Sequence, residues 1–190
     1  MRVVAGRWKG RILRAPRGTD VRPTTDKVRE AVFSIIGERV AEANVLDLFA
    51  GTGAMAIEAL SRGAAGAVLV ESSPAAVAVL RENLATVNAS SALCLPVDYR
   101  KALRRLALEG KTFSLVFLDP PYGRGLAAEA AEKLEEAGVL SPGALVVAES
   151  DRRDPMNKTP AGWIMESERK YGDTIISFYE AGAKGPIEPR

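Results

Sequence analysis

The sequence predicts an α/β fold, in which helices cover both faces of a mainly parallel sheet. Apolar runs of strand length alternate with longer amphipathic stretches along most of the 190 residues. A strand, a helix and a second strand in succession usually form a parallel pair with the helix packed on the sheet. The length, with 47% apolar residues, suits one domain with a real core.

The elements can be placed in order along the chain. Short apolar pairs flank a segment from Gly6 to Gly10, which predicts a small N-terminal hairpin. Helices are expected at about 26–36, capped by Thr24 or Thr25, then after Gly53, and at 74–88, 99–108 and 126–137. Strands are expected just before the glycine turn and at 67–70, 92–97, 113–118 and 144–148, with a final antiparallel pair at 162–165 and 174–179.

A glycine turn joins the first strand to the helix that follows it. Gly51 and Gly53 let the backbone turn tightly and approach a ligand, while the helix presents its first N–H groups. The spacing Gly51-x-Gly53-x-x-Ala56 also fits a dinucleotide fingerprint, and Glu71 follows the next strand where a ribose-binding acid is expected. The glycines alone therefore leave NAD and another adenosyl cofactor open.

Acidic residues at four strand ends favour one of these cofactors. Asp47 comes just before the glycine loop, where it would repel a pyrophosphate but would suit the ammonium of a methionine moiety. Asp98 follows the third strand, where an adenine would lie. A single acid at such a place is usually a helix cap or a solvated loop residue. With Glu71 and Asp119 the four acids fall in the expected order, so we predict S-adenosylmethionine as cofactor.

The strand at 113–118 ends in Asp119-Pro120-Pro121-Tyr122. Two prolines make a stiff extended turn whose carbonyl groups can only accept hydrogen bonds. We expect Asp119 and the Pro120 carbonyl to accept the two hydrogens of an exocyclic amine, while Tyr122 stacks on the base. The alternative is a strand-ending turn with a buried tyrosine. The proton acceptor stays open between Asp119 and water, because a carboxylate with an ordinary pKa of ~3.9 is a weak base.

Positive charge is concentrated near the N-terminus, although the formal net charge is only +2. Residues 1–29 hold nine lysines and arginines against two aspartates. Basic side chains beside an aromatic one are typical of a nucleic-acid surface, and the alternative is a solvated hairpin docked on the sheet. The candidate RNA-binding residues are Arg7, Trp8, Lys9, Arg11, Arg22 and Arg169. Turns explain the segments around Arg22 and Arg169 equally well, and a solvated helix face explains a second basic cluster, Arg100, Lys101, Arg104 and Arg105.

Composition excludes several other kinds of site and location. With no histidine and only Cys94, the chain has no plausible zinc site, no internal disulfide and no Ser-His or Cys-His pair. We therefore predict no metal. The sequence shows no run long and apolar enough to span a bilayer and no apolar signal core, so we expect a cytoplasmic protein.

Three further segments carry a family resemblance. They are RVVAGRWKGRILR at 2–14, RPTTDKVREAVFS at 22–34 and ERKYGDT at 168–174. With the motifs above they resemble the RsmD family, bacterial guanine-N2 methyltransferases of 16S ribosomal RNA, from residue 2 to about 180. The resemblance implies the Rossmann-like class I methyltransferase fold, with a seven-stranded sheet. It also implies that Gly51 and Gly53 lie by the methionine portion of the cofactor, with Glu71 at the ribose and Asp98 at the adenine.

The resemblance further implies that the target is N2 of guanine 966 in 16S RNA. We expect a hairpin extension at 1–22, a methyltransferase domain at 23–180 and a frayed tail at 181–190. The expected partner is 16S RNA, taken as the assembled small subunit with its ribosomal proteins, and we expect a monomer. One alternative is an amino-methyltransferase for adenine N6 of DNA or for another RNA, against which the basic hairpin and the RPTT segment argue. The other is an NAD-dependent oxidoreductase, which would not need the Asp119-Pro-Pro-Tyr motif.

Overall fold

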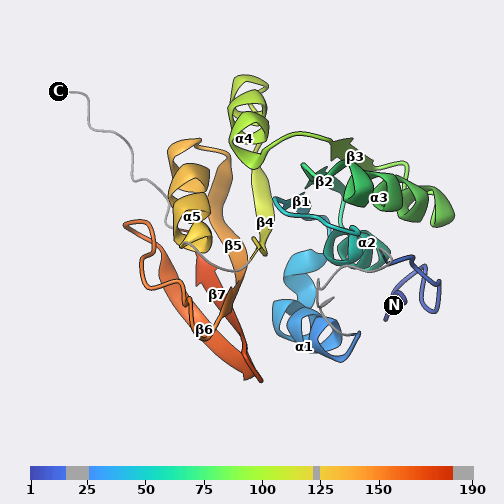
Figure 1. Ribbon diagram of the computed structural model, residues 1–190, viewed down its shortest axis with the longest axis horizontal. Coiled ribbons are helices and arrows are strands. Elements are labelled where there is room, and N and C mark those ends of the chain that lie inside the picture. The colour runs from blue at the N-terminus through green and yellow to red at the C-terminus, as the bar shows by residue number, and fades with distance from the viewer. Residues whose placement is uncertain (16–25, 122–124, 182–190) are drawn as a thin grey trace. The chain divides into compact units, whose positions relative to one another are not determined.

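The computed structural model describes residues 1–15, 26–121 and 125–181. Figure 1 shows the chain as a ribbon with its helices and strands labelled. Two compact units make up the chain, Met1–Ala102 and Leu103–Arg190. The first holds three of the seven strands and the second holds four.

Parallel strands form the sheet of the first unit. β1 (Asn44–Asp47) pairs with β2 (Gly66–Val70), and β2 pairs with β3 (Ala92–Leu95), both in parallel. Each pair of strands is joined through a helix, as parallel pairing requires. The carboxyl ends of the three strands therefore share one edge of this sheet, where ligands bind in folds of this kind.

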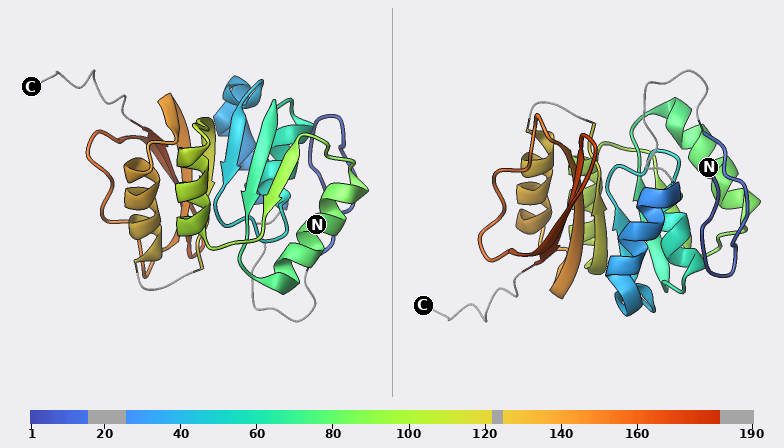
Figure 2. Two further views of the ribbon diagram at one scale, coloured as in Figure 1. Left: turned by 90° about the horizontal axis from the view of Figure 1, so that it is seen from above. Right: turned by 90° about the horizontal axis from the view of Figure 1, so that it is seen from below.

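The helices of the first unit bury their apolar sides. α1 (Asp26–Ile36) buries Val32, Phe33 and Ile36, and the short 3-10 helix η1 (Gly37–Val40) follows it directly. α2 (Ala54–Ser61) is buried from Ala56 to its end, whereas α3 (Pro74–Thr86) buries one side only. The right-hand view of Figure 2 shows α1 beside α2, and the guanidinium of Arg62, which directly follows α2, lies 4.8 Å from the centroid of the Phe33 ring.

The N-terminal segment packs on this first unit. Arg2 and Ile12 form an antiparallel bridge, and Val3 N–H donates to the Arg11 carbonyl at 2.9 Å. Val3 and Leu13 are buried against Ile57 of α2 and Val87 after α3. The predicted hairpin is therefore present as two chain stretches joined by one bridge and by backbone hydrogen bonds, without a regular strand on either side.

The sheet of the second unit is mixed, with one parallel and two antiparallel pairs of strands. β4 (Phe113–Leu118) runs parallel to β5 (Leu140–Asp151), and β7 (Thr174–Glu180) pairs antiparallel with both β5 and β6 (Ile164–Tyr171). α5 (Leu126–Glu136) packs against β4 and β5. α4 (Tyr99–Leu108) precedes β4 and buries Ala102, Leu103 and Leu106.

The expected elements are present, with three differences at strand bounds. β3 ends at Leu95, whereas 92–97 was expected. The final antiparallel pair is confirmed, but its first strand begins at Ile164 and runs to Tyr171, whereas residues 162–165 were expected. Gly162 lies in a turn with φ of 89°, and Trp163 is buried before the strand begins. β5 extends well beyond the expected 144–148 because its ladder with β7 continues to Asp151. Among the described residues, no helix has both the length and the apolar character needed to cross a membrane.

Candidate active site

The loop after β1 is held against the end of β2 by hydrogen bonds. Ala50 N–H donates to the Val70 carbonyl at 2.9 Å, and Gly51 N–H donates to Glu71 Oε2 at 2.9 Å. Gly53 N–H closes the turn on the Ala50 carbonyl at 2.7 Å. The loop is therefore shaped by the protein itself, and α2 begins directly after it.

The two glycines of the loop differ in the space around them. Both have left-handed backbones, with φ of 52° at Gly51 and 81° at Gly53. A Cβ on Gly53 would lie 2.4 Å from Leu80 Cδ1 and 3.2 Å from Leu69 Cδ2, so this glycine lets α3 pack closely on the loop. A Cβ on Gly51 would meet no atom within 4 Å, so the loop leaves open space on that side of its backbone. A bound ligand can approach the backbone at Gly51.

Glu71 shapes the loop and has further acceptor capacity. Its Oε2 accepts from Gly51 N–H, and its Oε1 accepts from Ser73 N–H at 2.7 Å. An ionised carboxylate offers about four acceptor positions, so each oxygen can take a second hydrogen bond. The partly exposed side chain stands at the end of β2, where the sequence predicted the ribose-binding acid.

Asp47 is the buried acid of the site. Its side chain lies at the end of β1, only 3% exposed, and accepts hydrogen bonds from the backbone N–H groups of Phe49 and Ala56. Burial raises the pKa of this carboxyl to about 7, and the nearby negative charge of Glu71 acts in the same direction. Asp47 thus ties β1 to the first turn of α2. A cation placed nearby would favour its charged form.

Asp98 directly precedes α4 and is next in sequence to one ring of an aromatic pair. Its Oδ1 accepts from Arg100 N–H at 2.9 Å, and its Oδ2 lies 3.5 Å from Arg100 Nη1. The carboxyl keeps acceptor positions for an amine, since its side chain is 44% exposed. The ring centroids of Tyr99 and Phe49 lie 5.1 Å apart, and this pair joins the ends of β1 and β3. Sequence reasoning missed both rings, although each is close in sequence to an acid that it singled out.

The donor set of this edge fits S-adenosylmethionine. Gly51 leaves space beside the backbone, and three carboxylates stand at the ends of successive parallel strands. The residues predicted to hold the cofactor are Asp47, Gly51, Gly53, Glu71 and Asp98 of this unit, together with Asp119, which follows β4 in the second unit. In the described ranges, no group of three or more Cys, Asp and Glu side chains is arranged to bind a metal ion.

The Asp119 motif belongs to the second unit. Asp119 follows the last residue of β4, a strand that is buried at five of its six positions. Asp119 is partly exposed, Pro120 is buried and Pro121 is exposed. The carboxylate thus follows the end of β4, and the two prolines follow it directly. Tyr122, the predicted stacking residue, lies outside the described residues.

Most of the predicted RNA-binding residues lie at the turn of the N-terminal segment. Arg7, Lys9 and Arg11 are exposed, and the Arg7 guanidinium lies 4.1 Å from the centroid of the Trp8 ring. Arg22 lies outside the described residues, as do Thr24 and Thr25. Arg169 is exposed on β6 in the second unit, within a strand and not at a turn.

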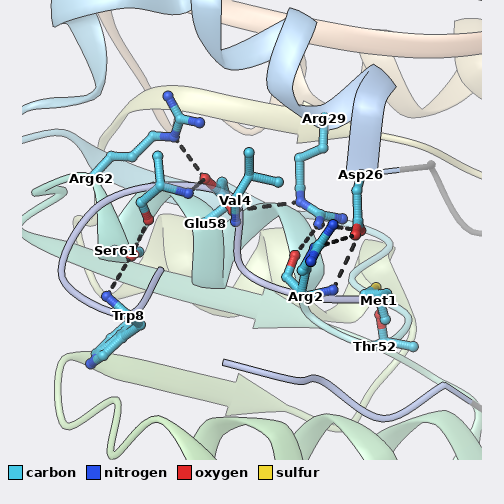
Figure 3. A network of polar contacts seen from close by, with 11 residues as sticks. Met1, Arg2, Val4, Trp8, Asp26, Arg29, Thr52, Glu58, Ser61 and Arg62 are labelled. Atoms are coloured by element: carbon cyan, nitrogen blue, oxygen red, sulfur yellow. Dashed lines mark hydrogen bonds and ion pairs between the residues drawn. The ribbon is translucent and has the colours of Figure 1, made fainter. Parts of the chain in front are cut away.

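Sequence reasoning also missed a buried polar network between α1, α2 and the N-terminal segment (Figure 3). Arg29 and Glu58 are both fully buried, and Arg29 Nε lies 3.6 Å from Glu58 Oε2. A third buried polar residue, Asn83 of α3, accepts from Arg14 N–H at 2.7 Å and donates to the Thr52 carbonyl at 2.9 Å. One signal was available, because Glu58 is the only charged residue of the apolar helix Ala54–Ser61.

Comparison with known proteins finds related sequences that match most of the chain. The family model described as "Conserved hypothetical protein 95" matches residues 1–180. "Ribosomal RNA small subunit methyltransferase D" of Escherichia coli (strain K12) is 40% identical over 185 residues, which cover 97% of this chain and 92% of that protein. "Putative rRNA methyltransferase YlbH" of Bacillus subtilis (strain 168) is 36% identical over 181 residues, covering 95% and 98% respectively.

A solved structure agrees with the fold. "Putative methyltransferase yhhF from Escherichia coli" superposes with a TM-score of 0.87 and 38% identity, covering 97% of this chain and 99% of that one. The predicted Rossmann-like class I methyltransferase fold is therefore confirmed, as is the enzyme class with its cofactor S-adenosylmethionine. The chain belongs to the family described as "Conserved hypothetical protein 95", which is the RsmD family of methyltransferases.

Proposed function

We propose that the protein transfers a methyl group from S-adenosylmethionine to N2 of a guanine in 16S ribosomal RNA. The observation that carries this proposal is the 40% identity, over 97% of the chain, to a protein named for methylation of small-subunit ribosomal RNA. The partly exposed Asp119 beside a proline turn is the local feature that suits an amine acceptor. Guanine 966 is the target that the family resemblance implies.

The cofactor would supply an electrophilic methyl group on a sulfonium. Glu71 would accept from the ribose hydroxyls while it keeps the Gly51 N–H in place, and Asp98 would accept from the adenine amine. The negative charge of Asp47 would attract the ammonium of the methionine portion. Its carboxylate also accepts hydrogen bonds from the backbone of the loop that would bind this portion. These residues would orient the methyl group toward the acceptor amine.

Asp119 and Pro120 would orient the acceptor. The amine of guanine is a poor nucleophile because its lone pair is drawn into the ring, so geometry must supply much of the rate. The Asp119 carboxylate and the Pro120 carbonyl would accept the two amine hydrogens and favour a pyramidal nitrogen. Tyr122 would stack on a base drawn out of its helix. Proton release to Asp119 or to water fits this arrangement equally.

The N-terminal segment would bind the RNA backbone. Arg7, Lys9 and Arg11 are exposed on one turn, and Trp8 lies within it. Arginine and lysine contacts to phosphates give affinity that falls with salt. Arg22 and Arg169 are further candidates for this surface.

The relative that is 40% identical is named for the RNA of the small ribosomal subunit. We propose that the assembled small subunit, with its ribosomal proteins, is preferred over naked 16S RNA, and that the enzyme acts as a monomer in the cytoplasm. Equal rates of methylation on naked 16S RNA and on subunits would contradict this preference.

The role of Asp119 can be tested by single-turnover methyl transfer. Asp119→Ala and Asp119→Asn should each lower the rate by on the order of 100-fold, because acceptor orientation is lost, while cofactor affinity measured by calorimetry stays within about threefold. An exposed control, Glu136→Gln, should behave as the wild type. A variant of Asp119 that transfers methyl groups at the wild-type rate would overturn the assignment.

A further inference from the structure

The carboxylate of Glu58 holds the backbone of the N-terminal segment. Glu58 Oε2 accepts from Val4 N–H at 2.7 Å, and Oε1 accepts from Ala5 N–H at 2.9 Å. These are contacts between residues more than fifty positions apart, made by a side chain with no exposed surface. Figure 3 shows Glu58 between Arg62 and Arg29, with Val4 beside it.

The last residue of α2, Ser61, continues the same contact. Ser61 Oγ donates to the Ala5 carbonyl at 2.6 Å and accepts from Trp8 N–H at 3.0 Å, while the Ser61 carbonyl accepts from Arg7 N–H at 2.8 Å. Gly6 lies between them with φ of 78°, and a Cβ there would be 1.9 Å from the Ser61 carbonyl oxygen. The backbone of residues 4–8 is therefore fixed on the end of α2 by five hydrogen bonds.

Two arginines balance the buried charge of Glu58. Arg62 Nε donates to Glu58 Oε1 at 2.8 Å, and Arg29 Nε lies 3.6 Å from Oε2. Arg29 Nη2 also donates to Asp26 Oδ1 at 2.8 Å and to the Arg2 carbonyl. A buried ion pair of this kind is rarely a net source of stability when compared with apolar packing. Its polar contacts do fix one position of the N-terminal segment.

The N-terminal end of α2 directly follows the cofactor loop, the glycine turn that ends at Gly53. The helix begins after Gly53, and its Ala56 N–H donates to the Asp47 carboxylate. Eight residues of helix span about 12 Å, so one short rigid element joins the loop to the docked segment. Both groups of contacts lie within the first unit.

We propose that Glu58 is a positioning residue for RNA, which fixes the turn bearing Arg7, Trp8, Lys9 and Arg11 to the helix that carries the cofactor loop. This inference rests on the proposed function, because it takes RNA as the partner of that turn. Glu58 is buried and would touch neither RNA nor cofactor. Its effect is exerted through the backbone of Val4 and Ala5.

Two variants test the proposal. Glu58→Gln replaces the charged acceptor, and Ser61→Ala removes the hydroxyl contacts while it leaves Glu58, Arg29 and Arg62 paired. Both should release the N-terminal peptide faster under limited trypsin, at the exposed Arg7 and Lys9. Both should also raise the KM for RNA by on the order of five- to tenfold, with kcat and the Kd for S-adenosylmethionine unchanged. Glu136→Gln, an exposed carboxylate on α5, is the matched control and should change none of these.

The results separate this inference from the proposed function. Faster tryptic release together with a raised KM for RNA supports it. Faster release with an unchanged KM overturns it and leaves the proposed function standing, as does unchanged release in Ser61→Ala. A wild-type enzyme that binds S-adenosylmethionine and transfers no methyl group to RNA would remove the proposed function and this inference with it. If Glu58→Gln fails to fold, Ser61→Ala decides alone.

Discussion

Alanine at Gly53 should mainly lower the stability of the fold, whereas alanine at Gly51 should mainly weaken cofactor binding. Both substitutions place a side chain on a left-handed backbone, which costs about 1–2 kcal/mol. At Gly53 the new Cβ would also come within 2.4 Å of Leu80 Cδ1 and 3.2 Å of Leu69 Cδ2, in a core without spare room. Overpacking of this kind costs about 1–3 kcal/mol more. The sum for Gly53→Ala is therefore roughly 2–5 kcal/mol of unfolding free energy.

Gly51→Ala should be much milder for folding and worse for binding. Its Cβ meets no atom within 4 Å, so only the backbone cost of about 1–2 kcal/mol remains. The methyl group would instead fill the open space beside the loop, where we propose that the cofactor binds. We expect the Kd for S-adenosylmethionine to rise by on the order of 10-fold or more, since about 1.4 kcal/mol of lost contact has that effect.

Urea unfolding and isothermal calorimetry on the same preparations test this pair of expectations. The predicted result is a large loss of unfolding free energy in Gly53→Ala and a large loss of affinity in folded Gly51→Ala. Equal destabilisation by the two substitutions would refute the packing argument at Gly53. Unchanged affinity in Gly51→Ala would refute the assignment of the open side of the loop to the cofactor.

Four further predictions concern the acids of the cofactor edge and the buried amide. Because the pKa of Asp47 is about 7 in the folded protein and 3.8 is its ordinary value, the folded state holds a proton that the unfolded chain has lost. This carboxyl should therefore lower the unfolding free energy as pH rises from about 4 to about 7, and urea titrations of wild type and Asp47→Asn should differ in that slope. The methionine ammonium should favour the charged form, so cofactor binding near pH 7 should release a proton, measurable by calorimetry in buffers of different ionisation enthalpy. Glu71→Ala frees the Gly51 N–H and should weaken cofactor binding by on the order of 10-fold or more, read out by titration; unchanged affinity would contradict its role. Asn83→Ala leaves backbone groups of Arg14 and Thr52 unpaired and should cost about 2–4 kcal/mol in urea unfolding, whereas a loss below about 0.5 kcal/mol would contradict the importance of these bonds.

Local signals explain why much of the fold could be predicted. α4 begins and ends at the expected residues because Asp98 accepts from Arg100 N–H at its start and Gly110 follows its end. β4 also has the expected bounds, since an apolar run stops at Asp119 and two prolines. Each of these boundaries is determined by a few neighbouring residues.

The start of β6 could not be predicted in the same way. Trp163 looks like a strand residue because it is apolar and buried, yet its burial comes from contacts distant in sequence. Its Nε1 donates to Glu135 Oε2 at 3.0 Å, and its ring lies 5.8 Å from that of Tyr179. The strand itself runs through Glu166 to Lys170, a polar stretch whose extended form is set by pairing with β7. Tertiary context decided this element.

The candidate site likewise contains residues that local sequence indicates and residues that depend on contacts distant in sequence. Glu71, Asp98 and Asp119 could be singled out as candidates because each follows a strand, and a strand end is a local feature with a known position in this kind of fold. Glu58 was missed because the groups it binds, Val4 and Ala5, lie 54 and 53 residues away in sequence. The structural use of Asp47 was missed for a related reason. The sequence suggests a charge for a ligand, whereas the fold also brings the Ala56 N–H to that carboxylate.

Nucleoside mass spectrometry on small ribosomal subunits that lack this modification would test the central claim most directly. Subunits, naked 16S RNA and DNA would each be incubated with the wild-type enzyme and labelled S-adenosylmethionine, then digested, with Asp119→Ala alongside. The account predicts N2-methylguanosine, mapping to a single guanine of the subunit RNA, from the wild type and none from Asp119→Ala. Methyladenine as the product, or label in DNA alone, would contradict it.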